Sequence, residues 1–103
     1  MEATTGIDLI IEERQKQFIK GRTIANDVAN NNKSELISAI MLLSASIGFK
    51  RGGAAFPKEA FDDLRPETWN EEKCIEYIDK PELDQLKMIG AFAAAEIDRL
   101  QNS

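Results

Sequence analysis

Residues 33–47 are apolar around most of the circumference of a helix, and no other feature constrains the fold as strongly. Such a helix has to be covered on more than one side. Nowhere does the chain show the sustained alternation of apolar and polar residues that marks a half-buried strand. The sequence therefore predicts an all-α fold around a central helix at 33–47 that ends at Gly48. Its apolar residues are Leu36, Ile37, Ile40, Met41, Leu42, Leu43 and Ile47.

A helix from about Gly6 to Lys20 is predicted by signals at both of its ends. Thr5 and Asp8 have the spacing of a capping box, and Gly21 can adopt the left-handed conformation that stops a helix. The apolar residues of this helix share one face, and Arg14 falls in the middle of that face. They are Ile7, Ile10, Ile11 and Phe18.

Two segments between helices are less regular. Residues 21–33 are expected to form an ordered loop with at most one short turn, followed by a second capping box of Asn32 and Glu35. Residues 48–70 contain a basic loop and one short helix that Pro57 can open and that runs through Leu64.

The C-terminal part predicts two helices. Asn70 caps the first, whose inward residues are Cys74, Ile75, Tyr77 and Ile78, and Lys80-Pro81 ends it. The last helix spans about 81–101, and its small residues predict close packing against another helix, with the central helix as the expected partner. Its apolar stripe consists of Leu83, Leu86, Gly90, Ala93, Ala94, Ile97 and Leu100.

Residues 1–103 are thus predicted to form a single all-α domain, a compact helical bundle of about four helices with an irregular segment between the second and the third. The chain has no histidine and one cysteine, which excludes hydrolases with a Ser–His triad or a Cys–His pair. No apolar run is long enough to cross a membrane. We therefore expect a cytoplasmic protein with no cofactor, no metal and a core role for Cys74.

Acidic residues are concentrated in one segment. Residues 59–84 carry ten acidic and three basic residues, whereas residues 1–58 carry eight basic and six acidic. This distribution argues against direct contact with nucleic acid. It could suit a basic partner, such as a nucleic-acid-binding or defence protein of a host, although a solvated helix face is the favoured alternative. The candidate partner-binding residues are Glu67, Glu71, Glu72, Glu76 and Asp79.

The segment GFKRGG at 48–53 is the candidate site for a phosphate group, because two cations adjoin glycines whose N–H groups can approach a ligand. It is no P-loop, since no Gly-Lys-Ser/Thr follows, and a flexible connector is the favoured alternative. An aromatic residue nearby in sequence could stack on a base or cover the edge of the core. The candidate ligand-binding residues are Lys50, Arg51, Gly52, Gly53 and Trp69.

Arg14 is expected to form an interior ion pair with Glu35 or Glu96, which flank the apolar faces of their helices. Carboxylates on one helix converge on an ion only at spacings of three or four residues. Glu96 and Asp98 are two apart and point away from each other. Glu72, Glu76 and Asp79 have the right spacing, as do Glu59 and Asp62, but both sets lie on faces away from the apolar residues, so a solvated surface is favoured over a metal site. We therefore predict no catalytic residue and no metal ligand.

Three segments together resemble a group of short phage and prophage proteins: ERQKQ at 13–17, SELISAI at 34–40 and KMIGAFAAAEIDRL at 87–100. In that group an ERxRQ segment precedes a "GEL..AA" helix, a Pro/Trp-containing stretch and a "K.GA.i.AEIDRL" helix. This chain departs from the group at 21–33, where it keeps only Asp27 of an acid-acid-histidine cluster. The resemblance implies an accessory protein of a mobile element, with no particular mechanism.

The expected function is binding without catalysis, either to a host defence or effector protein, as in counter-defence, or to a small anionic nucleotide. A homo-oligomer is compatible with either. The alternative is a divergent relative of the MazG-type all-α nucleotide pyrophosphohydrolases, which act with magnesium. Its carboxylates would be Glu13, Glu35, Glu96 and Asp98, and the lack of a pair spaced i, i+3 among them argues against it.

Overall fold

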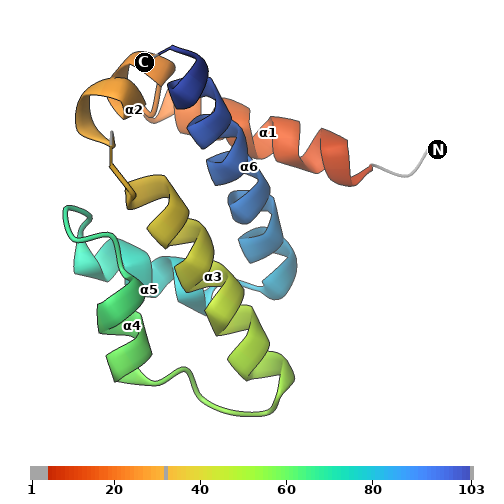
Figure 1. The fold of residues 1–103 in the computed structure, drawn as a ribbon. Helices are drawn as coiled ribbons and strands as arrows, with labels where there is room; N and C mark the ends of the chain where they lie inside the picture. Colours follow the sequence, from red (N-terminus) through yellow and green to blue (C-terminus); the bar gives the residue numbers. More distant parts are fainter. Residues whose placement is uncertain (1–4, 32, 103) are drawn as a thin grey trace.

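The computed structural model describes residues 5–31 and 33–102, and all regular secondary structure within these ranges is helical (Figure 1). The prediction of an all-α fold is therefore confirmed, but the expected number of about four helices is wrong. The described part of the chain forms six, which are α1 (Gly6–Ile19), α2 (Ile24–Asn30), α3 (Glu35–Arg51), α4 (Lys58–Leu64), α5 (Glu71–Asp79) and α6 (Glu82–Gln101).

Two short helices account for most of the difference. α2 lies where a loop was expected, and the side chain of Thr23 caps it by accepting a hydrogen bond from the Asn26 N–H at 3.2 Å. α4 follows Pro57, as the sequence predicted, and it divides the irregular segment. The central helix, α3, also continues through Gly48 to Arg51 rather than ending at the glycine.

The predicted ends of the other helices are confirmed. The Thr5 hydroxyl accepts from the Asp8 N–H at 3.2 Å and the Asp8 carboxylate accepts from the Thr5 N–H at 3.3 Å, which completes the capping box of α1. Gly21 has a φ of 90°, a left-handed conformation that glycine adopts without strain. Asn70 caps α5 through the Lys73 N–H. Asn32 of the expected second box lies outside the described residues.

The helices pack around α3 and α6, which lie against each other along much of their length (Figure 1). α4 and α5 contact α3, whereas α1 and α2 contact α6. α3 therefore has neighbours on several sides, as its apolar circumference predicted. The main core lies between α3 and α6, and a smaller cluster of Leu42, Phe61 and Cys74 lies beneath α4 and α5. The main core consists of Leu36, Ala39, Leu43, Met88, Phe92 and Ala95.

The buried face of α6 differs from the predicted stripe. Leu83, Leu86 and Ile97 are exposed, while two polar residues, Gln85 and Glu96, are buried. The side-chain amide of Gln85 donates to the carbonyl oxygens of Tyr77 and Ile78 at 3.0 and 2.7 Å, which offsets part of the cost of its burial, while its Oε1 has no hydrogen-bond partner among the described residues. A prediction from hydropathy alone places polar residues such as Gln85 and Glu96 on the exposed face of a helix. The predicted apolar face of α6 is therefore rotated about the helix axis relative to the face that is buried in the structure.

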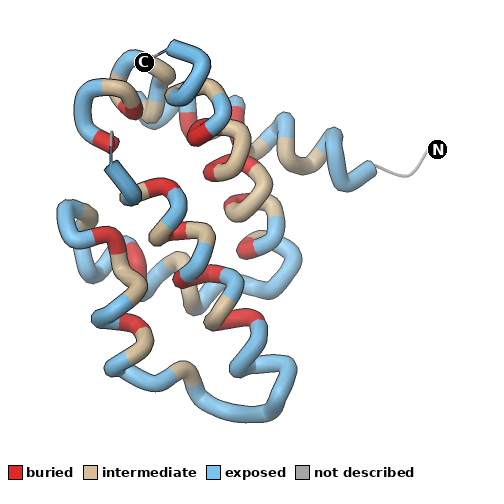
Figure 2. The backbone as a smooth tube through the Cα atoms, in the orientation of Figure 1, coloured by how far each residue is buried: buried red, intermediate tan, exposed pale blue. Residues whose placement is uncertain are grey.

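The close-packed seam at Gly90 faces α1 instead of the central helix. A Cβ atom at this position would lie 2.5 Å from Cδ1 of Ile10. α1 crosses α6 here, and its N-terminal half extends past α6 without a buried residue (Figure 2). Ile7 is 72% exposed and Ile11 50%, so most of the predicted apolar face of α1 does not enter the core.

Within the described ranges, no helix is long and apolar enough to cross a membrane.

Candidate anion-binding site

The two cations of the predicted phosphate loop lie at the end of α3, where other parts of the chain bind them. The Lys50 ammonium donates to the Ile78 carbonyl, and the Arg51 guanidinium makes two hydrogen bonds to the Glu82 carboxylate, at 2.6 and 3.0 Å. The arginine lowers the pKa of Glu82 through these bonds. Gly52 and Gly53 follow as the helix stop, and Gly53 has a left-handed φ of 75°. These contacts join the end of α3 to the α5–α6 connection.

Trp69 belongs to a different part of the structure. Its indole ring packs against Phe92 with 5.4 Å between centroids, and its N–H donates to the Asn31 side-chain oxygen at 2.9 Å. The Arg22 guanidinium lies over the indole, 4.5 Å from the ring centroid. The structure therefore groups Trp69 with Arg22 and α2 and not with Lys50 and Arg51.

The acidic residues proposed to bind a partner are all exposed. Glu67 lies in the turn that precedes α5, and the other four lie on α5 itself. One of them, Glu76, lies 3.7 Å from Lys73 on the same helix. No described contact gathers this group into a defined site. The five acidic residues of this group are Glu67, Glu71, Glu72, Glu76 and Asp79.

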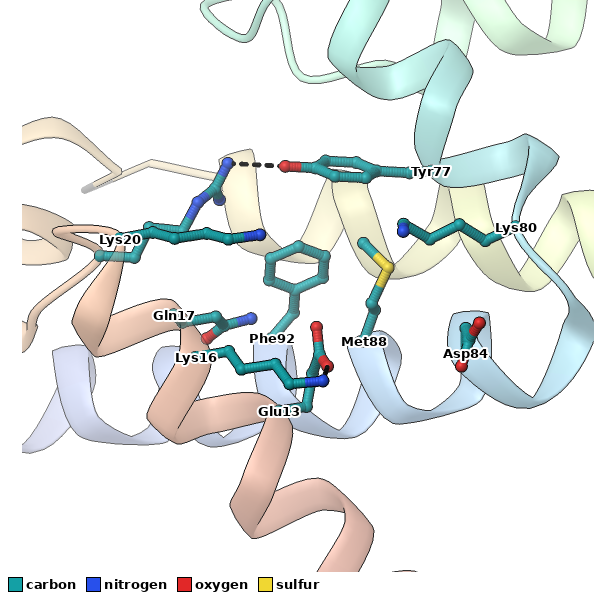
Figure 3. Close-up of a pocket in the computed structure, with 10 residues that line it drawn as sticks. Glu13, Lys16, Gln17, Lys20, Tyr77, Lys80, Asp84, Met88 and Phe92 are labelled. Carbon is teal, nitrogen blue, oxygen red and sulfur yellow. Dashed lines mark hydrogen bonds and ion pairs between the residues drawn. The ribbon is translucent and has the colours of Figure 1, made fainter.

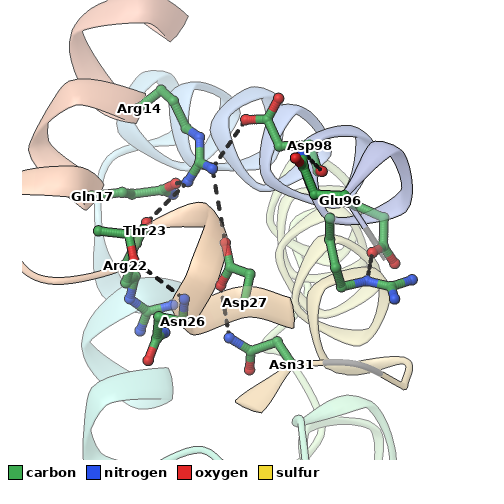
Figure 4. A network of polar contacts seen from close by, with 11 residues as sticks. Arg14, Gln17, Arg22, Thr23, Asn26, Asp27, Asn31, Glu96 and Asp98 are labelled. Carbon is green, nitrogen blue, oxygen red and sulfur yellow. Dashed lines mark hydrogen bonds and ion pairs between the residues drawn. The ribbon is translucent and has the colours of Figure 1, made fainter. Parts of the chain in front are cut away.

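Arg14 lies in the interior, but its partners differ from the expected ones (Figure 4). Its guanidinium donates to Asp98 at 3.1 Å and to the Gln17 side chain at 2.8 Å, and it lies 3.8 Å from the Asp27 carboxylate. Glu96 instead pairs with Arg99 one turn along α6. Glu35, the other expected partner, accepts from the Lys33 N–H at 3.0 Å.

Asp27, the acid retained in segment 21–33, is buried on α2. It accepts a hydrogen bond from the Asn31 side chain at 2.8 Å, while its Oδ2 has no hydrogen-bond partner among the described residues. Burial raises the pKa of Asp27, because the lost hydration outweighs this bond and the nearby charges of Arg14 and Arg22. Asp27 is therefore a structural link between α1 and α2.

The structure brings a different set of cations together, around a pocket of about 190 Å³ between α1, α5 and α6 (Figure 3). Lys20 and Lys80 reach toward each other from opposite sides, and Phe92 and Met88 lie between them. The lining residues are Glu13, Lys16, Gln17, Lys20, Arg22, Tyr77, Lys80, Asp84, Met88 and Phe92.

The charge of this pocket favours an anion. Four basic residues line it against two acidic ones, Glu13 and Asp84. Glu13 lies 3.9 Å from the Lys16 ammonium, a weak surface contact that leaves the lysine free to move toward a ligand. Buried Met88 and Phe92 give the pocket an apolar floor, on which a charge is less screened than in open water.

Arg22 is the most firmly held cation of the pocket. Its guanidinium donates to the Tyr77 hydroxyl at 3.1 Å, lies over Trp69 and also faces Phe92 at 5.7 Å. These contacts come from the turn before α5, from α5 and from α6, so the arginine is oriented before any ligand arrives. Orientation in advance reduces the entropy that binding costs.

The sequence contained a partial signal for this pocket. Lys16, Lys20 and Arg22 form a basic run at the end of the first helix, and a spacing of four places the two lysines on one side of it. Lys80 joins them only through the tertiary fold.

Cys74 is fully buried, and burial raises the pKa of its thiol, which agrees with the predicted role of this residue in the core.

Residues 5–31 and 33–102 contain no group of three or more histidine, cysteine or acidic side chains placed to hold a metal ion. The chain was also compared with protein-family models, with curated proteins and with solved structures, and none of the three comparisons gave a match.

Proposed function

We propose that this protein binds a small anionic ligand, without catalysis, in the pocket between α1, α5 and α6. The observation that carries the proposal is the convergence of Lys16, Lys20 and Arg22, at the end of α1, with Lys80, which follows α5, onto one pocket. Positively charged side chains repel one another, so placing them side by side destabilises the fold unless a bound anion offsets the repulsion. The resemblance to phage and prophage proteins would make such binding part of an accessory role.

The chemistry of the lining residues favours phosphate groups. Lysine ammonium groups act as mobile point charges for phosphate, and a fixed guanidinium supplies paired donors. At about 190 Å³ the pocket is smaller than the sites that enclose a drug-sized molecule. A chain of two or three phosphates matches both the size and the charge.

Pyrophosphohydrolase activity is the less favoured alternative, because three of the four acids it needs are engaged elsewhere. Asp98 is bonded to Arg14, Glu96 is paired with Arg99, and Glu35 accepts from a backbone N–H. Magnesium-dependent release of pyrophosphate from a nucleoside triphosphate would establish this alternative and contradict a purely binding role.

Partner binding through the acidic face of α5 also stays a proposal. It is supported only by the exposure of Glu67, Glu71, Glu72, Glu76 and Asp79. The pocket is preferred because its residues converge on one volume, whereas these acids are spread over a helix and a turn.

Titration calorimetry with sodium tripolyphosphate tests the proposal. Lys20→Ala combined with Lys80→Ala should weaken binding by about tenfold or more, since two charge-assisted contacts are lost. Lys33→Ala combined with Lys58→Ala removes the same charge at exposed positions outside the pocket and should change the affinity little. No binding by the unaltered protein, or equal losses in both double variants, would overturn the proposed site.

A further inference from the structure

A second, larger depression adjoins the cationic pocket. It has a volume of about 430 Å³ and is lined by Arg22, Asn26, Asn30, Asn31, Thr68 and Trp69. Arg22 also lines the cationic pocket, so the two depressions share this side chain as a wall. We call the second depression the amide groove, after its three asparagines. Arg22 is its one charged lining residue, in contrast to the six that line the pocket.

We infer that the anionic ligand is a nucleotide, with its phosphates in the cationic pocket and its base in the amide groove. The inference rests on the proposed function, since it assigns the rest of the same ligand. The cationic pocket alone is too small for a whole nucleotide, whereas the adjoining groove has more than twice its volume. A molecule with a phosphate chain at one end and a neutral planar group at the other can place the phosphates in the cationic pocket and the planar group in the amide groove.

The groove carries the groups that read the edge of a base. Asparagine side chains offer both a donor and an acceptor, which is the pattern that base edges match. Asn30 donates to the Asn26 side-chain oxygen at 2.8 Å. This bond uses one amide hydrogen of Asn30, and each amide has further donor capacity. The bond therefore fixes both side chains along the groove without exhausting them.

The Arg22 guanidinium supplies the flat surface for the base, because it covers the Trp69 indole, which also packs against Phe92. The guanidinium carbon of Arg22 lies over the indole, 4.5 Å from its centroid, and the Trp69 N–H donates to the Asn31 side-chain oxygen. Bases stack on aromatic rings and on arginine planes alike. Arg22 would thus contact the ligand at its middle, where the base and the phosphates meet.

Calorimetry with tripolyphosphate, ATP, GTP, CTP and UTP tests the inference on the full chain, without magnesium. At least one nucleotide should bind about tenfold or more tightly than tripolyphosphate, because stacking adds to the phosphate contacts. Asn30→Ala should remove most of that gain and leave the tripolyphosphate affinity unchanged. Asn30 is exposed and lies at the end of α2, so this change leaves the core intact.

A second variant approaches the groove from its other side. Thr68→Leu fills space at an exposed turn residue and should also remove the nucleotide gain, with an unchanged circular dichroism spectrum. If tripolyphosphate binds and every nucleotide binds no tighter, the inference fails while the proposed function stands. If a nucleotide gain survives both variants, the groove is not the base site and the inference is overturned. If neither probe binds, the proposed function fails as well.

Discussion

The guanidinium of Arg14 and the carboxylate of Asp98 lie 3.1 Å apart, although 84 residues separate them along the chain. The pair fixes α1 across the last turns of α6 (Figure 4). The Arg14 guanidinium also donates to the Arg22 carbonyl oxygen at 3.3 Å. The interior polar contacts therefore hold both α1 and Arg22 in the positions from which they line the cationic pocket.

Loss of this pair should destabilise the fold. In Asp98→Ala, Arg14 remains buried without its hydrogen-bonded acid, and we expect the free energy of unfolding to fall by about 1–3 kcal/mol. Urea denaturation measures the change. The exposed Asp63→Ala is the matched control and should alter stability by less than about 0.5 kcal/mol. Equal effects of the two substitutions would show that the Arg14 contact contributes nothing.

The raised pKa of Asp27 predicts a specific dependence of stability on pH. The folded state binds this proton more tightly than the unfolded state, in which the pKa is near 3.8. The contribution of Asp27 to stability is therefore complete below about pH 3.8 and is lost as pH rises through the folded pKa. The stability of the unaltered protein relative to Asp27→Asn should fall over this range and then level off. A difference that does not vary with pH would contradict the raised pKa.

The contact between Gly90 and Ile10 predicts a coupled effect on stability. Gly90→Leu should destabilise by about 1–3 kcal/mol through overpacking against α1, since even a Cβ atom would lie 2.5 Å from Ile10. In the background of Ile10→Ala the same change should cost clearly less. A double-mutant cycle by urea denaturation measures the coupling. Additive effects would mean that the two residues do not meet.

The two ends of α1 and the start of α5 were the most predictable part of the fold. Thr5 with Asp8, Gly21 and Asn70 act on their immediate neighbours, so their effects can be read from local sequence. The short helix α2 was missed because its asparagines favour turns when considered alone. Asp27 accepts from Asn31 one turn along the helix and lies 3.8 Å from Arg14, and Asn31 accepts from Trp69. The contacts with Arg14 and Trp69 are ones that only the tertiary fold supplies.

The candidate site was less predictable, because it depends on how the helices are rotated. Hydropathy placed Gln85 outside the buried face of α6, whereas its bonds to the end of α5 draw it inside. The rotation brings Met88 and Phe92 beneath Lys20 and Lys80 (Figure 3). In the sequence, Lys50 and Arg51 beside two glycines were the stronger local signal for an anion site. In the structure, however, Lys50 is bonded to the Ile78 carbonyl and Arg51 to Glu82.

Nuclear magnetic resonance localises the ligand most directly. In a ¹⁵N-labelled sample titrated with sodium tripolyphosphate, we expect the largest amide shift changes at residues 16–22 and 77–84, around the cationic pocket. Lys20→Ala combined with Lys80→Ala should abolish these changes at the same ligand concentration. Saturable changes centred on residues 48–53, or no saturable change at all, would contradict the assignment of the pocket as the anion site.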